Sequence, residues 1–172
     1  MQRRILTFSS LLVTSVFLLT PGTRAQAPQE VPNRSQAVTF NVVEATIPEM
    51  QAALASGRAT SRDLVAAYLG RIAQYEPTLN ATMSVNLNAY SEADDLDRER
   101  QQGKVRGPLH GIPIAVKDIL NTTFMPTTGG ALAFAGYTPP YNATVVTNLR
   151  AAGAIIIAKT VLTELANWVA NG

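Results

Sequence analysis

The chain has 172 residues, enough for one domain with a hydrophobic core, and its lack of cysteine excludes a disulfide framework and a thiolate metal site. Its one histidine, His110, argues against a metal site built on several histidines. The 14 basic residues exceed the 12 acidic ones only because Arg3, Arg4 and Arg24 lie among the first 25 residues. The remainder carries 11 basic and 12 acidic residues, a net charge of −1, which predicts no nucleic-acid partner.

Residues 1–25 are typical of a secretory signal peptide, with two arginines, an apolar run at 5–19 and small residues around the possible cleavage points. Cleavage after Ala25 or after Ala27 fits this pattern, and we favour Ala25 because the other site leaves proline at the new N-terminus. The run is short and polar for a membrane span, so we expect a secreted or periplasmic protein without stable membrane insertion. An uncleaved anchor is the alternative. Residues 26–42 lack periodicity and indicate a leader or linker.

The domain is expected at 43–172 and begins with helices. Start and stop signals predict helices from Thr46 to about Ser56, from Thr60 or Ser61 to about Tyr75, and from Ala89 to about Gln102. We expect Pro77 to end the second helix and Asn88 to cap the third. Acidic residues on the third helix alternate with arginines, which favours a solvated face over a metal site.

The stretch GPLHGIPIAVKDIL, residues 107–120, predicts a strand that ends at a charged pair. Pro113 is expected at or before its first residue, and the apolar run 114–116 predicts a strand buried on both faces. Lys117 follows at once. An ammonium group cannot be buried without a partner, so this lysine is paired, neutralised or placed at a strand end that faces a cleft. A strand-end lysine that reaches solvent is the alternative.

A second buried strand, AIIIA at 154–158, follows a helix predicted at 143–152. A strand, a helix and a strand make a βαβ unit with parallel strands. Lys117 and Lys159 should then lie at the same carboxyl edge of the sheet, where open α/β sheets bind ligands. We expect Lys159 to cap its strand or to pair with Glu164.

Three segments carry a resemblance to the amidase signature family. They are PLHGIPIAVKDIL, the stretch from MPTTGGALAF to GAIIIAKT, and LTELANW, and the resemblance extends over residues 43–172. It implies an α/β fold of the amidase-signature type, in which N-terminal helices precede part of a mixed sheet covered by helices. It also implies hydrolysis or transfer of amides by a Ser–Ser–Lys triad, without a metal or organic cofactor.

The resemblance assigns the catalytic lysine of the VKD motif to Lys117. The two serines belong to a Gly- and Ser-rich signature that the sequence does not contain, so we expect a truncated part of a longer protein, inactive by itself. Thr128 and Gly129 are candidates for lining the substrate cleft, with a plain turn as the alternative. We expect a structural role for His110, and we expect Asp118 to order the strand end.

Three functions fit these observations. The first is an exported amidase that acts on a small-molecule or peptide amide. The second is a component of a tRNA-dependent amidotransferase, which shares the motif. The signal peptide and the near-neutral charge argue against it, because that work is cytoplasmic and involves RNA. The third is a non-catalytic, amidase-like fragment.

Overall fold

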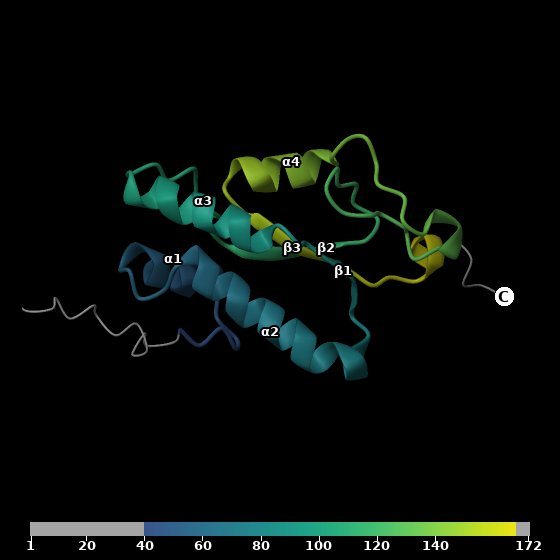
Figure 1. Ribbon diagram of the computed structural model, residues 1–172, viewed down its shortest axis with the longest axis horizontal. Coiled ribbons are helices and arrows are strands. Elements are labelled where there is room, and N and C mark those ends of the chain that lie inside the picture. The colour runs from purple at the N-terminus through teal and green to yellow at the C-terminus, as the bar shows by residue number, and fades with distance from the viewer. Residues whose placement is uncertain (1–39, 168–172) are drawn as a thin grey trace, which may run out of the picture. The chain divides into compact units, whose positions relative to one another are not determined.

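The computed structural model describes residues 40–167, which lie in one compact unit (Figure 1). The predicted signal peptide, most of the predicted leader, and residues 168–172 lie outside the described residues. The elements in chain order are α1 (Ile47–Ala55), α2 (Ser61–Leu79), β1 (Thr82–Val85), α3 (Ala89–Gln101), β2 (Pro113–Lys117), the 3₁₀ helix η2 (Leu132–Phe134), α4 (Thr144–Ala151), β3 (Ile155–Thr160) and the 3₁₀ helix η3 (Glu164–Asn167). Within residues 40–167, no helix combines the length and apolar character that a membrane crossing requires.

The strands form one mixed sheet in the order β1-β3-β2. The central strand, β3, is parallel to β2 and antiparallel to β1. Five of its six residues are buried, which confirms the second predicted strand. The parallel pairing of β2 and β3 confirms the βαβ unit, and it places Lys117 opposite Thr160 at one edge of the sheet.

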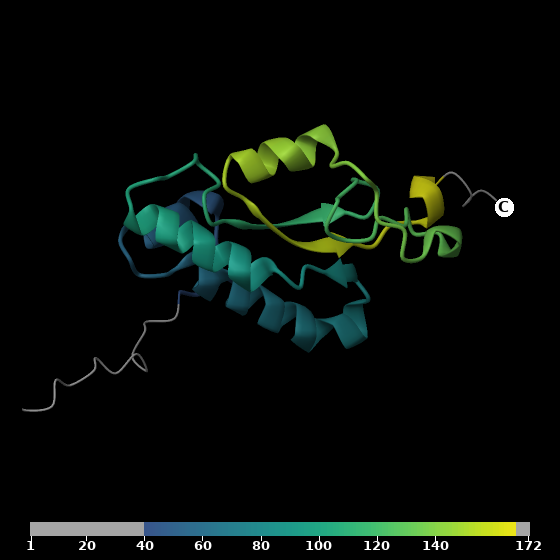
Figure 2. The same ribbon diagram turned by 45° about the horizontal axis from the view of Figure 1, so that its top comes forward.

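Helices cover both faces of the sheet (Figure 2). On one face, α2 and α3 pack against Ile155 and Ile157 of β3. On the other face, Val146 of α4 packs against Val116 of β2 and Ile156 of β3. Successive side chains of a strand point to opposite faces. Residues 155–158 of β3 are all apolar because helices bury the strand from both sides. This arrangement confirms the predicted α/β class.

The helix boundaries follow the predicted signals with two exceptions. A capping box links Thr46 and Glu49 at the start of α1, as predicted. However, Pro77 lies inside α2, which continues to Leu79, so the prediction that it ends the helix is wrong. Only Thr78 and Leu79 follow it in the helix, and Asn80 then ends α2 in the left-handed conformation. The third helix starts as predicted, but the Asn88 side chain makes no capping hydrogen bond.

The prediction that β2 is buried on both faces is also wrong for the described residues. Val116 is buried, whereas Ala115 and Lys117 are exposed. The reason is position in the sheet, since β2 pairs with β3 alone among the described strands. A short apolar run does not distinguish a central strand from an edge strand.

The acidic residues of α3 bind arginines, as the charge pattern predicts. Ion pairs join Arg62 to Asp94, Arg98 to Asp95, Arg106 to Glu99 and Arg150 to Glu92. Asp97 instead accepts hydrogen bonds from the backbone N–H groups of Ser61 and Arg62. It therefore supplies acceptors to the first turn of α2, where N–H groups lack partners within the helix.

Candidate active site

Lys117 is the last residue of β2, at the carboxyl edge of the sheet. Its side chain is exposed, whereas those of its neighbours, Val116 and Asp118, are buried. Successive side chains of a strand point to opposite faces, so the two buried neighbours share one side and Lys117 points to the other. The structure thus places an accessible amine at the carboxyl edge of the sheet, the edge at which open α/β sheets in general bind ligands.

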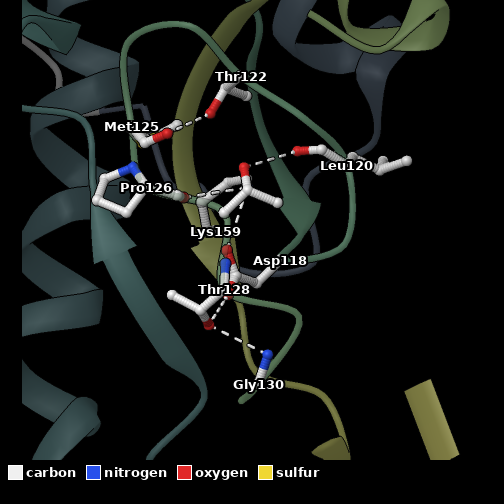
Figure 3. A network of polar contacts seen from close by, with 9 residues as sticks. Asp118, Leu120, Thr122, Met125, Pro126, Thr128, Gly130 and Lys159 are labelled. Atoms are coloured by element: carbon white, nitrogen blue, oxygen red, sulfur yellow. Dashed lines mark hydrogen bonds and ion pairs between the residues drawn. The ribbon is translucent and has the colours of Figure 1, made fainter. Parts of the chain in front are cut away.

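Asp118 forms a buried ion pair with Lys159 on the neighbouring strand (Figure 3). The distance from Lys159 Nζ to Asp118 Oδ1 is 3.1 Å, and the side chains are 0% and 1% exposed. The ammonium group also donates to Thr127 Oγ1 at 2.7 Å and to the Pro126 carbonyl at 3.3 Å. Three acceptors therefore match its three N–H donors, which a buried ammonium requires.

The second oxygen of Asp118 holds the loop that contains Thr128 and Gly129. Asp118 Oδ2 accepts hydrogen bonds from the backbone N–H and the hydroxyl of Thr128. Gly129 N–H donates to the Asp118 carbonyl at 3.0 Å, and Gly130 N–H donates to Thr128 Oγ1 at 3.1 Å. The expectation that Asp118 orders the strand end is confirmed, and its carboxylate also orders this loop.

The two glycines of the loop lie against the segment that follows β3. Gly129 accepts a hydrogen bond from Leu165 N–H at 2.8 Å. Gly130 has a φ of +72°, and a Cβ atom there would lie 2.9 Å from the Leu162 carbonyl oxygen. A side chain would therefore meet both backbone strain and a clash, so glycine is required for this close approach.

Burial lowers the pKa of Lys159, and the hydrogen bond and charge of Asp118 oppose that effect by raising it. Perturbed pKa values are typical of functional groups, but they also occur in structural ion pairs. A proton acceptor must reach the proton that it takes, and a fully buried Lys159 cannot do so. Between the two strand-end lysines, accessibility favours Lys117.

The prediction that Lys159 pairs with Glu164 is wrong, because its ammonium binds Asp118 instead. Asp118 and Lys159 are 41 residues apart in the chain. The parallel register brings them together, because Val116 pairs with Lys159. Next to this pair, the Asp118 N–H donates to the Thr160 carbonyl at 3.0 Å. The sequence predicted both lysines and the aspartate of the VKD motif near one sheet edge. It did not show which lysine is buried, because Lys117 also follows an apolar run and is exposed.

His110 is 2% exposed and lies away from this cluster. Its Nε2 donates to the Leu96 carbonyl at 2.9 Å, and its Nδ1 accepts from Arg106 N–H at 3.2 Å. Both ring nitrogens are used within the fold, as expected for a structural histidine. Among residues 40–167, no three His, Asp or Glu side chains come together as a metal site.

Comparison with known proteins identifies the family, since residues 63–171 match the Amidase family. The chain belongs to this family. A glutamyl-tRNA(Gln) amidotransferase subunit of Chloroflexus aurantiacus is 46% identical over 122 residues, covering 70% of this chain and 25% of that protein. A putative amidase of Schizosaccharomyces pombe is 41% identical over 129 residues, covering 74% and 22%.

Solved structures of amidases share the fold. Peptide amidase from Stenotrophomonas maltophilia has a TM-score of 0.70 and 43% identity, covering 73% of this chain and 26% of that one. An amidase family protein from Bacillus anthracis has a TM-score of 0.68 and 35% identity, covering 72% and 25%. The amidase-signature resemblance and fold are confirmed. This amidase-family chain spans about a quarter of the length of the relatives that it matches.

Proposed function

We propose that this chain is the N-terminal part of an exported amidase that hydrolyses carboxylic amide bonds. The observation that carries the proposal is the position of Lys117 in the VKD motif, exposed at the carboxyl edge of the sheet beside the loop that Asp118 orders. The relatives named amidase and peptide amidase support an amide as the substrate class. The signal-peptide pattern of residues 1–25 supports a secreted or periplasmic location.

In the proposed reaction, Lys117 accepts a proton in its neutral form. A serine hydroxyl is a poor nucleophile until a base takes its proton. In a Ser–Ser–Lys triad, that proton passes through the bridging serine to the lysine, and the serine oxygen bonds to the amide carbon. The lysine then returns the proton to the leaving amine as the C–N bond breaks, and water next hydrolyses the acyl-serine ester, which releases the carboxylic acid and restores the serine hydroxyl. The two serines come from the Gly- and Ser-rich signature, and no metal or organic cofactor takes part.

Thr128 and Gly129 are proposed to border the substrate cleft. The N–H and the hydroxyl of Thr128 donate to the Asp118 carboxylate, and the N–H of Gly129 donates to the Asp118 backbone carbonyl. Their proposed contribution is therefore the shape of the cleft wall rather than free hydrogen-bond donors.

The test begins with the DNA beyond the codon for Gly172. An open reading frame that encodes the Ser-rich signature supports the proposal, and a stop codon supports a non-catalytic fragment. The encoded protein is then assayed for ammonia or amine release from peptide amides and small amides. N-terminal sequencing of the exported product should begin near Gln26, whereas an intact Met1 on a membrane-bound form would contradict signal cleavage.

A second candidate is a component of a tRNA-dependent amidotransferase. The observation in its favour is the 46% identity to such a protein from Chloroflexus aurantiacus. The signal-peptide pattern and the charge of −1 after residue 25 oppose it. Transfer of ammonia from an amide donor to a mischarged tRNA in the presence of partner proteins, without hydrolysis of amides in their absence, would favour this candidate.

A further inference from the structure

Asp118 ties the backbone on the carboxyl side of Lys117 to the neighbouring strand and to the neighbouring loop. Its N–H donates to the Thr160 carbonyl at 3.0 Å, and its carbonyl accepts from Gly129 N–H at 3.0 Å. Its carboxylate binds Lys159 through one oxygen and Thr128 through the other. The strand end that carries Lys117 and the neighbouring loop are thus held by the same side chain.

Lys159 anchors this side chain to the centre of the sheet. It lies on β3, the strand with partners on both sides, and its ammonium reaches Asp118, Thr127 and the Pro126 carbonyl (Figure 3). Two segments that are distant in the sequence, residues 118–127 and β3, therefore meet at one buried nitrogen. An apolar side chain would fill this space but could not form hydrogen bonds that hold the three acceptors in place.

We propose that Lys159 is a positioning residue for Lys117. Through Asp118, the buried ammonium fixes the strand end from which Lys117 projects and the loop of residues 127–130 beside it. The inference rests on the proposed role of Lys117 as proton acceptor. Lys159 itself exchanges no proton with the substrate, because its side chain is 0% exposed.

The energetics of buried ion pairs support a role beyond stability. Replacing such a pair by apolar residues of similar volume is often neutral or stabilising, because both charges lose their hydration. Burial lowers the pKa of Lys159, so its charge depends on the partners that surround it. The buried ion pair is therefore expected to add little stability compared with an apolar pair. Its hydrogen bonds instead fix the positions of their partners, as catalytic geometry requires.

The first readout is backbone amide hydrogen exchange in the full-length protein, a measurement that does not depend on catalytic activity. The main variant is Lys159→Met/Asp118→Asn, which removes both charges and leaves no unpaired ion in the core. A milder variant, Thr127→Val, removes one acceptor of Lys159. In both, we expect the amides of residues 128–130 to exchange about tenfold faster or more, because they lose local protection. Amides of α1, such as those of Met50 and Ser56, serve as the internal reference.

The second readout compares how much the substitutions change kcat with how much they change KM in the full-length protein. A displaced catalytic group lowers the rate after binding, so kcat should fall on the order of 10- to 100-fold in the double variant, with KM within about twofold. Thr127→Val should lower kcat by a smaller factor. Thr123→Val is the matched control, because Thr123 lies in the same loop region but is exposed and bonds to Asn142. It should change neither readout.

The outcomes separate this inference from the proposed function. Faster exchange of residues 128–130 together with a lower kcat supports the positioning role. An unchanged exchange rate or an unchanged kcat in the folded double variant overturns it. If the unsubstituted full-length protein releases no amine from any amide, the proposed function fails first, and the positioning role falls with it.

Discussion

The side chain of Lys117 is exposed and that of Lys159 is fully buried, although both follow apolar runs on neighbouring parallel strands. The difference follows from alternation along the strand. Val116 and Lys159 are register partners, so Lys159 shares the covered side of the sheet with Val116, whereas Lys117 pairs with Thr160 and points the other way. Among the described residues, the side chain of Lys117 is therefore accessible, and that of Lys159 is confined to the core.

Lys117→Ala should abolish proton transfer in a full-length protein that carries both serines. We expect a rate reduction of at least ~10²–10⁴-fold, the usual contribution of general acid–base catalysis. Lys117→Arg should not restore activity, because a guanidinium stays protonated. The measurement is amide hydrolysis against pH for variants whose folding is checked by circular dichroism. Near wild-type turnover in a folded Lys117→Arg protein would show that the side chain supplies only charge.

Lys159→Met should lower the free energy of unfolding strongly, because it leaves the Asp118 carboxylate buried without a counter-charge. Breaking a buried pair in this way costs about 3–5 kcal/mol. The matched control is Arg98→Gln, which removes the exposed pair with Asp95 and should cost less than about 1 kcal/mol. Chemical denaturation measures both. Equal losses for the two variants would contradict the assigned difference in burial.

Gly153→Ala should destabilise the protein more than Gly57→Ala. Both glycines have positive φ, +91° and +71°, so each alanine carries a similar backbone cost. Only at Gly153 would the new Cβ meet another residue, at 2.6 Å from His110 Cα. Because that contact is with backbone, we expect an additional loss of about 1–3 kcal/mol in thermal or chemical unfolding. A larger loss for Gly57→Ala would contradict this close approach.

The capping box of α1 should make stability depend on acid pH. The backbone N–H and then the hydroxyl of Thr46 bind the Glu49 carboxylate and hold its pKa below the usual 4.5. A lowered pKa in the folded state gives stability that is present above pH 4.5 and is lost as the pH falls through the folded pKa. Glu49→Gln removes this titration but keeps an acceptor.

The measurement is the free energy of unfolding of wild type and Glu49→Gln as a function of pH. The advantage of wild type should shrink as the pH falls from about 6 to about 3, because protonation makes the two side chains alike. A constant difference across this range would show that Glu49 does not titrate as part of the capping box.

Local chemistry determined much of this protein from its sequence. The capping box at Thr46, the positive-φ glycine after α1, and the apolar run AIIIA each act within a few residues, so helices and strands could be placed without tertiary information. The order of strand, helix and strand also predicted the parallel pairing that brings Lys117 and Lys159 to one edge. The VKD motif within that order marked Lys117 as the candidate catalytic residue.

Tertiary structure decided what depends on neighbours distant in the chain. β2 is exposed on part of its surface, because it pairs with β3 alone among the described strands. The partner of Lys159 is Asp118 rather than the nearby Glu164, because the register of parallel strands and the burial of both groups outweigh proximity in sequence. A buried ammonium binds the acceptors that surround it, and only the folded chain determines which acceptors those are.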